Sequence, residues 1–287
     1  MNGGMIRSFR GINLPDTPLS TPALTEKDLK DLDFGLENDV DFVALSFVRK
    51  PEDVIGLRSR IEAAGKNAFI ISKIEKPEAI TNIDRIIEES DGIMVARGDL
   101  GAETSAEDVP ILQKQIITKC NFAHKPVITA TQMMESMISK PKPTRAEAND
   151  VANAIFDGTD AVMLSGESAN GKYPVESVQM MDAIIRKAEI SSAKWSHQYA
   201  SSISEKTDDA SAISIVARDL AQNRQVSSVA VFTQSGRSAL LESKARPEVP
   251  ILAFTPNPQT FHTLGLYWGV TPHFVPFSPA PGPVNYS

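Results

Sequence analysis

Short apolar runs alternate with amphipathic stretches along most of this chain. The apolar runs are rich in Val and Ile without regular polar alternation, and they lie at 42–47, 69–74, 92–96, 126–130 and 161–164. Such runs are typical of strands buried on both faces, and strands that alternate with helices predict a parallel sheet. The expected helices lie at 25–38, from 51 onward, and at 78–89, 109–124, 145–156 and 174–190.

Polar groups follow each of these five strands at its carboxyl end. They are Ser46 and Arg49, Lys73 and Glu75, Gly98 and Asp99, Thr129 and Thr131, and Ser165 and Glu167. Consecutive strands that deliver polar groups at their carboxyl ends are the arrangement of a (β/α)8 TIM barrel. A doubly wound sheet would concentrate them at its switch point. We therefore expect an α/β fold with a partial TIM barrel of about five βα units, although a closed barrel needs eight.

A second α/β region follows a polar stretch at 193–208 that has the composition of a linker. The pattern there predicts helices at 209–222, 237–244 and 258–265 and strands at 227–232, 251–254 and 273–275. The last residues carry four prolines without a strand pattern, so we expect them to be disordered. The predicted organisation is a partial TIM-barrel catalytic domain at 1–192, a linker at 193–208, and a truncated α/β regulatory domain with a disordered tail at 209–287.

Composition and charge narrow the classes of function. The chain has 287 residues, 41% of them hydrophobic and 23% charged, which is enough for two globular domains. Its net charge of −7 argues against a nucleic-acid partner, because binding a phosphate backbone needs a basic surface. No apolar run reaches the ~20 residues of a membrane span, and the first ten residues lack the apolar core of a secretory signal. With one cysteine, Cys120, expected to be a buried structural thiol, we expect a cytoplasmic location.

The most specific chemistry lies between residues 69 and 103. Lys73 and Glu75 are two residues apart on a predicted strand, so both side chains point to the same side. Asp99 follows the next strand, and one helical crossover joins the two strands. Two carboxylates and an ammonium group at neighbouring strand ends suit a hard divalent cation and a phosphorylated ligand. The alternative interpretation is that each is an ordinary solvated residue after a strand.

The sequence TQSGRSA at 233–239 connects a predicted strand to a predicted helix. Its hydroxyls and backbone N–H groups at a helix N-terminus could hold a phosphate. The same residues also describe an ordinary strand-to-helix turn with serine caps. The local sequence leaves both interpretations open.

Several longer stretches resemble the pyruvate kinase family, from Gly11 to about Val275. They are GINLP, LTEKD, DFVALSFVR, ISKIE, SDGIMVARGDLGAE, KPVITATQMMESM, PTRAEANDVANAIFDGTDAVMLSGES, TQSGRSA and RPEVPILAFTP. The resemblance implies phosphoryl transfer from phosphoenolpyruvate to ADP, the last step of glycolysis, which gives pyruvate and ATP. It also implies Mg²⁺ or Mn²⁺ as a cofactor, together with K⁺.

The resemblance assigns roles to the strand-end residues. Glu75 and Asp99 match the carboxylates that bind the divalent cation, and Lys73 matches the lysine held against the transferring phosphoryl group. Gly98, Asp99 and Thr131 match positions that hold the substrate's carboxylate side. Lys73 and Thr131 are therefore the candidate catalytic residues.

The resemblance also implies regulation and assembly. The residues that match the loop for the phosphate of fructose 1,6-bisphosphate, a sugar-phosphate effector of regulated members, are Thr233, Ser235, Gly236, Arg237 and Ser238. The helix that begins at Arg145 resembles the family's subunit contact, which implies a homotetramer.

The chain departs from the usual family sequence at three places. Lys76 to Ala79 follow KIE, where the family usually has Asn and later Gly, and Ala102 to Ser105 follow GDLG in place of the usual VEIP. Asp16 follows Pro15, where Gly is usual. The resemblance further implies that three barrel strands with the K⁺ ligands, a lid domain and the end of the C-terminal domain are not in this chain. We therefore expect a fragment or a truncated homologue.

Two other functions remain open at this point. A chain with five barrel units could be a catalytically inactive homologue that acts as a binding or interaction module, because unpaired sheet edges invite partners. Another barrel enzyme that handles phosphoenolpyruvate or an enolate would also place Mg²⁺ between strand-end Glu and Asp residues. Such an enzyme would not share TATQMMESM and TQSGRSA.

Overall fold

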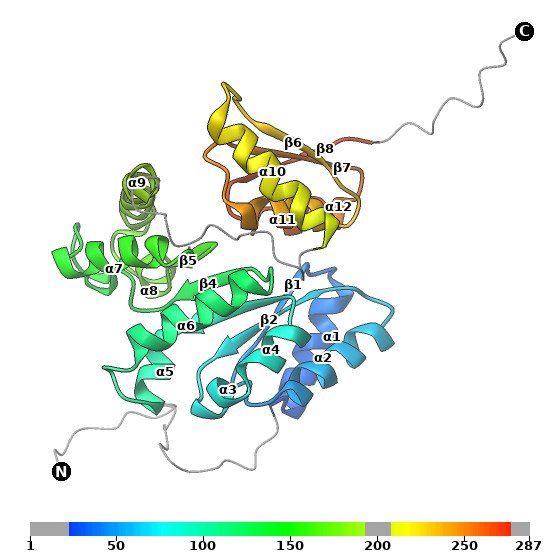
Figure 1. Ribbon diagram of the computed structural model, residues 1–287. Helices are drawn as coiled ribbons and strands as arrows, with labels where there is room; N and C mark the ends of the chain where they lie inside the picture. The colour runs from blue at the N-terminus through cyan, green and yellow to red at the C-terminus, as the bar shows by residue number, and fades with distance from the viewer. Residues whose placement is uncertain (1–22, 193–207, 277–287) are drawn as a thin grey trace, which may run out of the picture.

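Two parallel sheets with helices packed on them organise the chain in the computed structural model (Figure 1). The structure describes residues 23–192 and 208–276. The first sheet has the strand order β1-β2-β3-β4-β5, and the second has the order β6-β7-β8. Within each sheet, every strand pairs in parallel with the next strand along the chain, as the unalternating apolar runs predicted.

The first sheet is an open part of a barrel. Its strands are β1 (Phe42–Leu45), β2 (Phe69–Ile74), β3 (Gly92–Ala96), β4 (Val127–Ala130) and β5 (Ala161–Met163). Its helices are α1 (Glu26–Glu37), α2 (Pro51–Ala63), α3 (Pro77–Thr81), α4 (Ile83–Glu89), α5 (Arg97–Glu103), α6 (Val109–Phe122), η1 (Glu135–Ile138), α7 (Arg145–Phe156), α8 (Gly166–Ala169) and α9 (Pro174–Ser192). Strands β1 and β5 form its two edges, so the prediction of five βα units without closure is confirmed.

Local sequence explains where several helices begin. Thr25 and Thr144 precede α1 and α7, and each accepts a hydrogen bond from the backbone N–H of the third helical residue. The carboxylates of Asp28 and Glu147 each accept a hydrogen bond from the backbone N–H of the capping threonine, which completes a capping box. The predicted starts of both helices are therefore correct.

Two local predictions are wrong. The helix predicted at 78–89 is two helices, because Asn82 leaves helical geometry and its side chain donates to the carbonyl of Arg49 at 2.9 Å. The strand predicted at 42–47 ends at Leu45, and Phe47 has a left-handed φ of 55°. The strand predicted at 92–96 is β3 with the same bounds, and it is followed by the short helix α5, which the sequence pattern did not predict.

The two faces of the first sheet have different partners. The outer face packs against the helices in one core, in which Ile70, Ile74 and Ile93 of the strands meet Leu57 and Ile117 of the helices. A second apolar cluster on the strands contains Ile71, Met94 and Ala130. Because side chains alternate along a strand, Lys73 and Glu75 lie on the same face as Ile71.

The second sheet forms a smaller domain with its own core. Its elements are α10 (Asp209–Asn223), β6 (Val229–Phe232), α11 (Arg237–Ala245), β7 (Ile251–Thr255), α12 (Pro258–Leu264) and β8 (Val270–Phe274). Ala239, Ala253, Leu264 and Tyr267 are buried together at its centre. The predicted linker, apart from Asp208, and the predicted disordered tail from residue 277 onward lie outside the described residues.

A buried ionic cluster joins the small domain to the barrel region. Lys244 Nζ lies 2.5 Å from Asp160 Oδ2, and these side chains are 2% and 1% exposed. Arg246 Nη2 lies 2.8 Å from the other Asp160 oxygen. Asp160 also accepts a hydrogen bond from the backbone N–H of Val127 at 2.8 Å. The Trp268 ring lies 4.6 Å from the Arg246 guanidinium, so the cations of the small domain are enclosed at the start of β4 and β5.

Two remaining sequence expectations concern burial and membranes. Cys120 is fully buried, and burial raises the pKa of its thiol to about 12, as expected of a structural cysteine. Within 23–192 and 208–276, no helix has both the length and the apolar character needed to cross a membrane.

We expect Asp160→Ala to destabilise the protein strongly. The substitution leaves the Lys244 ammonium buried without its carboxylate, which costs about 3–5 kcal/mol in the free energy of unfolding. Urea denaturation checks this value. Lys66→Ala is the matched control, because Lys66 forms a more exposed pair with Asp39, and its loss should cost at most about 1 kcal/mol. Similar losses in both variants would contradict the prediction.

Glu242 on α11 should make stability depend on pH. Its side chain is 3% exposed, its Oε1 has no hydrogen-bond partner among the described residues, and burial raises its pKa from 4.5 to about 7. Between these two values the folded state keeps a proton that the unfolded state has lost, so the free energy of unfolding falls as pH rises. Urea titrations from pH 4.5 to 8 should show this fall, and Glu242→Gln should lack it. An unchanged slope in the variant would refute the assignment.

Candidate functional site

The carboxyl ends of β2 and β3 lie side by side and bring the predicted residues together. In the parallel register Lys73 faces Met94 and Ile74 faces Val95. Lys73 Nζ lies 2.6 Å from Glu75 Oε1, and the Glu75 side chain is 1% exposed. The predicted same-side geometry of Lys73 and Glu75 is therefore present as an ion pair.

The end of β1 completes the surroundings of this pair. The backbone N–H of Phe47 donates to Glu75 Oε2 at 2.7 Å, and Lys73 Nζ donates to Ser46 Oγ at 2.9 Å. Both carboxylate oxygens of Glu75 are thus bonded, which offsets the cost of burying the charge. These two contacts fix the orientation of the Glu75 carboxylate.

Asp99 and Gly98 lie in the first turn of α5, directly after β3. Among the described residues, no hydrogen bond or ion pair is formed by the Asp99 carboxylate, so its oxygens are available to a ligand. The backbone N–H of Gly98 donates to Thr131 Oγ1 at 2.8 Å. A Cβ atom at position 98 would lie 3.3 Å from the same oxygen, so glycine permits this close approach.

Thr131 lies in a strained turn after β4. Thr131 and Gln132 both have left-handed φ values, 66° and 53°. Each such residue costs of order 1–3 kcal/mol unless its surroundings enforce the geometry. The turn therefore needs an external support.

Arg97 supplies that support, and sequence reasoning did not identify it as a functional residue. Its Nη2 donates to the carbonyls of Thr131 and Gln132 at 2.7 and 3.1 Å, and its Nη1 pairs with Asp150 Oδ2 at 2.7 Å. The Arg97 side chain is 7% exposed. The only signal in the sequence is a charged residue directly after a fully apolar strand, which does not reveal its partners.

Glu167 supports the ends of β4 and β5 in a similar way. Its carboxylate accepts from the backbone N–H groups of Met134 at 3.0 Å and Ser165 at 2.9 Å, and the side chain is buried. A small cavity of about 190 Å³ lies beside it. The residues that line this cavity are Thr131, Gln132, Glu135, Ile138, Ser165, Gly166 and Glu167.

The donor atoms at the strand ends fit a hard divalent cation. Mg²⁺ is usually held by one or two carboxylates together with waters and substrate phosphates. Glu75 and Asp99 supply two carboxylates of this kind at neighbouring strand ends. Within the described ranges, no three His, Cys, Asp or Glu residues are grouped to hold a metal ion by themselves. A cation here would therefore need oxygen atoms from a bound ligand or water.

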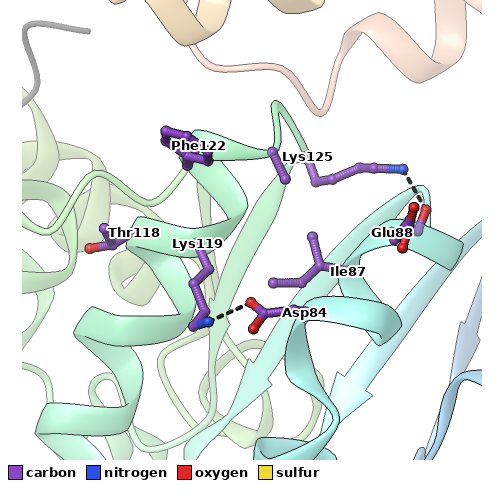
Figure 2. A pocket seen from close by; sticks show the side chains of 8 residues that line it. Asp84, Ile87, Glu88, Thr118, Lys119, Phe122 and Lys125 are labelled. Atoms are coloured by element: carbon purple, nitrogen blue, oxygen red, sulfur yellow. Dashed lines mark hydrogen bonds and ion pairs between the residues drawn. The ribbon is translucent and has the colours of Figure 1, made fainter. Parts of the chain in front are cut away.

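A larger hollow lies elsewhere, between α4 and α6. It has a volume of about 740 Å³ and is lined by Asp84, Ile87, Glu88, Thr118, Lys119, Phe122, Ala123 and Lys125. Figure 2 shows Lys119 reaching Asp84 across it and Lys125 reaching the backbone carbonyl of Glu88. Lys119 is paired with Asp84, Lys125 is bonded to backbone carbonyls, and none of the strand-end residues lines the hollow. We therefore assign it no part in the site.

The turn before α11 presents part of the predicted phosphate loop. Gly236 has φ 84° and its N–H donates to Thr233 Oγ1 at 2.9 Å. Thr233 and Gly236 are buried, whereas Ser235, Arg237 and Ser238 are exposed. Arg237 forms an ion pair with Asp208 at the start of α10. The exposed hydroxyls remain beside the helix N-terminus.

Comparisons with known proteins place the chain beside one family. A family model described as "Pyruvate kinase, barrel domain" matches residues 1–178, and one described as "Pyruvate kinase, alpha/beta domain" matches residues 211–280. The chain is 49% identical over 274 residues to "Pyruvate kinase" of Clostridium acetobutylicum, covering 94% of this chain and 58% of the relative. It is 49% identical over 273 residues to "Pyruvate kinase 2" of Synechocystis, covering 95% of this chain and 46% of the relative. The chain thus spans about half the length of the curated relatives it matches.

Arg97→Met should destabilise the strand-end turn. It removes a buried cation from the half-exposed Asp150 and leaves the carbonyls of Thr131 and Gln132 without this donor, so we expect a loss of about 1–3 kcal/mol in the free energy of unfolding. The free energy of unfolding of Arg97→Lys should lie between those of Arg97→Met and the unaltered protein, because one ammonium cannot reproduce the planar fork of a guanidinium. Urea denaturation measures both. Arg60→Met, which breaks the exposed pair with Asp33, is the control. If it costs as much as Arg97→Met, the assigned role is wrong.

Proposed function

Because this chain belongs to the pyruvate kinase family, we propose that its strand ends form part of a site that transfers a phosphoryl group from phosphoenolpyruvate to ADP. The observation that carries the proposal is the buried Lys73–Glu75 pair at 2.6 Å, next to the strand end that carries Asp99. A structural ion pair would not require an adjacent carboxylate without a partner. The pair and Asp99 together suit a metal-bound phosphate.

Glu75 and Asp99 are the residues that would hold Mg²⁺ or Mn²⁺ in this site. The cation supplies Lewis-acid polarisation of the phosphoryl and enolate oxygens when it is bound. The hydrogen bond from Phe47 and the contact with Lys73 keep the Glu75 carboxylate oriented. K⁺ is expected from the family, and we assign it no residues in this chain.

Lys73 is proposed to stabilise the charge of the transferring phosphoryl group. In this reaction the bond between phosphorus and the enol oxygen breaks, and a bond from phosphorus to a terminal oxygen of ADP forms. Charge is spread over the equatorial phosphoryl oxygens during transfer, so a fixed ammonium group lowers the barrier. The enolate left behind takes up a proton at carbon to give pyruvate.

Gly98, Asp99 and Thr131 are proposed to hold the carboxylate side of the substrate. The absence of a side chain on Gly98 permits close approach to its backbone, and the Thr131 hydroxyl is already fixed by its bond with the Gly98 N–H. Arg97 donates to the carbonyls of Thr131 and Gln132, so these oxygens are already bonded within the protein.

We further propose a sugar-phosphate effector at the turn before α11 and a homotetramer that uses α7. The exposed Ser235, Arg237 and Ser238 surround the helix N-terminus, which suits a phosphate. An effector would compete with Asp208 for Arg237, since these two residues are paired. Arg145 is exposed at the start of α7, where a subunit contact would have access to it.

Lys73→Met and Glu75→Gln should each reduce phosphoryl transfer. The test is a chimera in which this chain replaces the matching part of the C. acetobutylicum relative, assayed for pyruvate formation with Mg²⁺, K⁺, ADP and phosphoenolpyruvate. Loss of one electrostatic stabiliser costs about 3 kcal/mol, so kcat should fall on the order of 10²–10³-fold. Unchanged turnover in either variant would overturn the assignment.

Lys66→Met is the matched control for this assay. Lys66 forms an ion pair with Asp39 on the other side of the barrel region, before β2. The variant should therefore keep full turnover. A fall equal to that of Lys73→Met would show that the assay reports general damage and not the chemistry of the site.

A further inference from the structure

A second buried ion pair lies directly beside the proposed metal carboxylates. Lys76 Nζ lies 2.7 Å from Glu103 Oε1, and the two side chains are 10% and 7% exposed. Lys76 follows Glu75 along the chain, and Glu103 is the last residue of α5, whose first turn carries Asp99. The pair therefore connects the two segments that present Glu75 and Asp99.

Phe47 ties the same pair to the end of β1. Its ring centroid lies 5.9 Å from the Lys76 ammonium, and its backbone N–H is the donor that holds Glu75. One residue with a left-handed φ thus contacts the metal carboxylate through its backbone and Lys76 through its ring. The ends of β1 and β2 and the end of α5 meet at this point.

Helix α5 has seven residues, and its beginning is attached to the end of β4 and to α7 rather than to the end of β2. Arg97 bonds to the Thr131 carbonyl and to Asp150, and the Gly98 N–H donates to Thr131 Oγ1. At its end, the backbone N–H and the hydroxyl of Thr104 both bond to the carbonyl of Leu100, which closes the helix without attaching it to a strand. Leu100 is buried, so the helix is packed. Apolar packing is non-directional and fixes a position less sharply than an ion pair.

We infer that Lys76 and Glu103 are positioning residues that hold α5 against the end of β2 and thereby set the separation of Glu75 and Asp99. The inference rests on the proposed function, in which Glu75 and Asp99 hold one divalent cation and must therefore lie at a defined separation. Burying two charges as a pair is seldom stabilising in comparison with apolar packing. Groups that orient metal ligands, in contrast, commonly change metal affinity 10–100-fold when they are removed.

A similar ion pair at the opposite ends of the same two strands provides a matched control. Arg58 Nη2 lies 3.0 Å from Asp91 Oδ2, and Asp91 also accepts from the backbone N–H of Ile70. This pair ties α2 to the amino ends of β2 and β3. Removing it should disturb the sheet without moving α5.

The first test is Mn²⁺ binding to the 287-residue chain, followed by electron paramagnetic resonance of the free ion. We expect Lys76→Met and Glu103→Gln each to raise the Kd for Mn²⁺ about 10–100-fold. The double variant should bind Mn²⁺ with the same Kd as either single variant, because both substitutions remove the same contact. Lys76→Arg should restore most of the affinity, and Arg58→Met should leave the Kd unchanged. All variants are compared at a temperature at which circular dichroism shows them folded.

Amide hydrogen exchange gives a second measurement that needs no metal. Loss of the Lys76–Glu103 pair should speed exchange of the Thr104 N–H, which bonds to the Leu100 carbonyl at the end of α5, whereas Arg58→Met should not. An unchanged Kd together with unchanged Thr104 exchange overturns the inference, and so does an equal effect of Arg58→Met. If the unaltered chain binds no Mn²⁺, the metal site of the proposed function fails, and the exchange rates alone decide whether the pair holds α5.

Discussion

The buried guanidinium of Arg97 is the interaction on which the shape of the strand ends depends. A cation that is 7% exposed must have partners, and Arg97 has the carboxylate of Asp150 and the carbonyls of Thr131 and Gln132. These bonds stabilise two consecutive residues with left-handed backbones, which would be costly otherwise. In this geometry Thr131 Oγ1 reaches the N–H of Gly98. The ends of β3 and β4 are therefore shaped by one buried side chain.

At the end of β2, too, charged side chains with little exposure are paired within the protein, with one ion pair on each side of the strand. Lys73 and Glu75 pair on one side, and Lys76 reaches Glu103 on the other. Every charge in this set except that of Asp99 is neutralised within the protein. A phosphorylated ligand and its cation would thus meet groups that are already oriented, which reduces the cost of reorganisation on binding. They would also have to compete with the Lys73–Glu75 contact.

Helix α11 connects the turn proposed to bind an effector to the barrel region. It begins after the turn at Gly236 and carries Lys244 in its last turn, where the ammonium is enclosed with Asp160. Asp160 accepts from the N–H of Val127, the first residue of β4, and that strand ends beside Thr131. Burial lowers the pKa of Lys244, although the nearby Asp160 carboxylate opposes this effect. The small domain is therefore held to the barrel region by desolvated charges whose loss is costly.

The sequence by itself determined the two parallel sheets, the five βα units and the same-side placement of Lys73 and Glu75. These features follow from local periodicity, because a run of apolar residues and a two-residue spacing have the same meaning wherever the chain lies. Only the tertiary structure decided the break at Asn82, the support by Arg97 and the contact between Lys244 and Asp160. Their partners are 33, 34 and 84 residues away in sequence. Such contacts depend on strand register and packing, and local sequence does not record which distant group will arrive beside a buried charge.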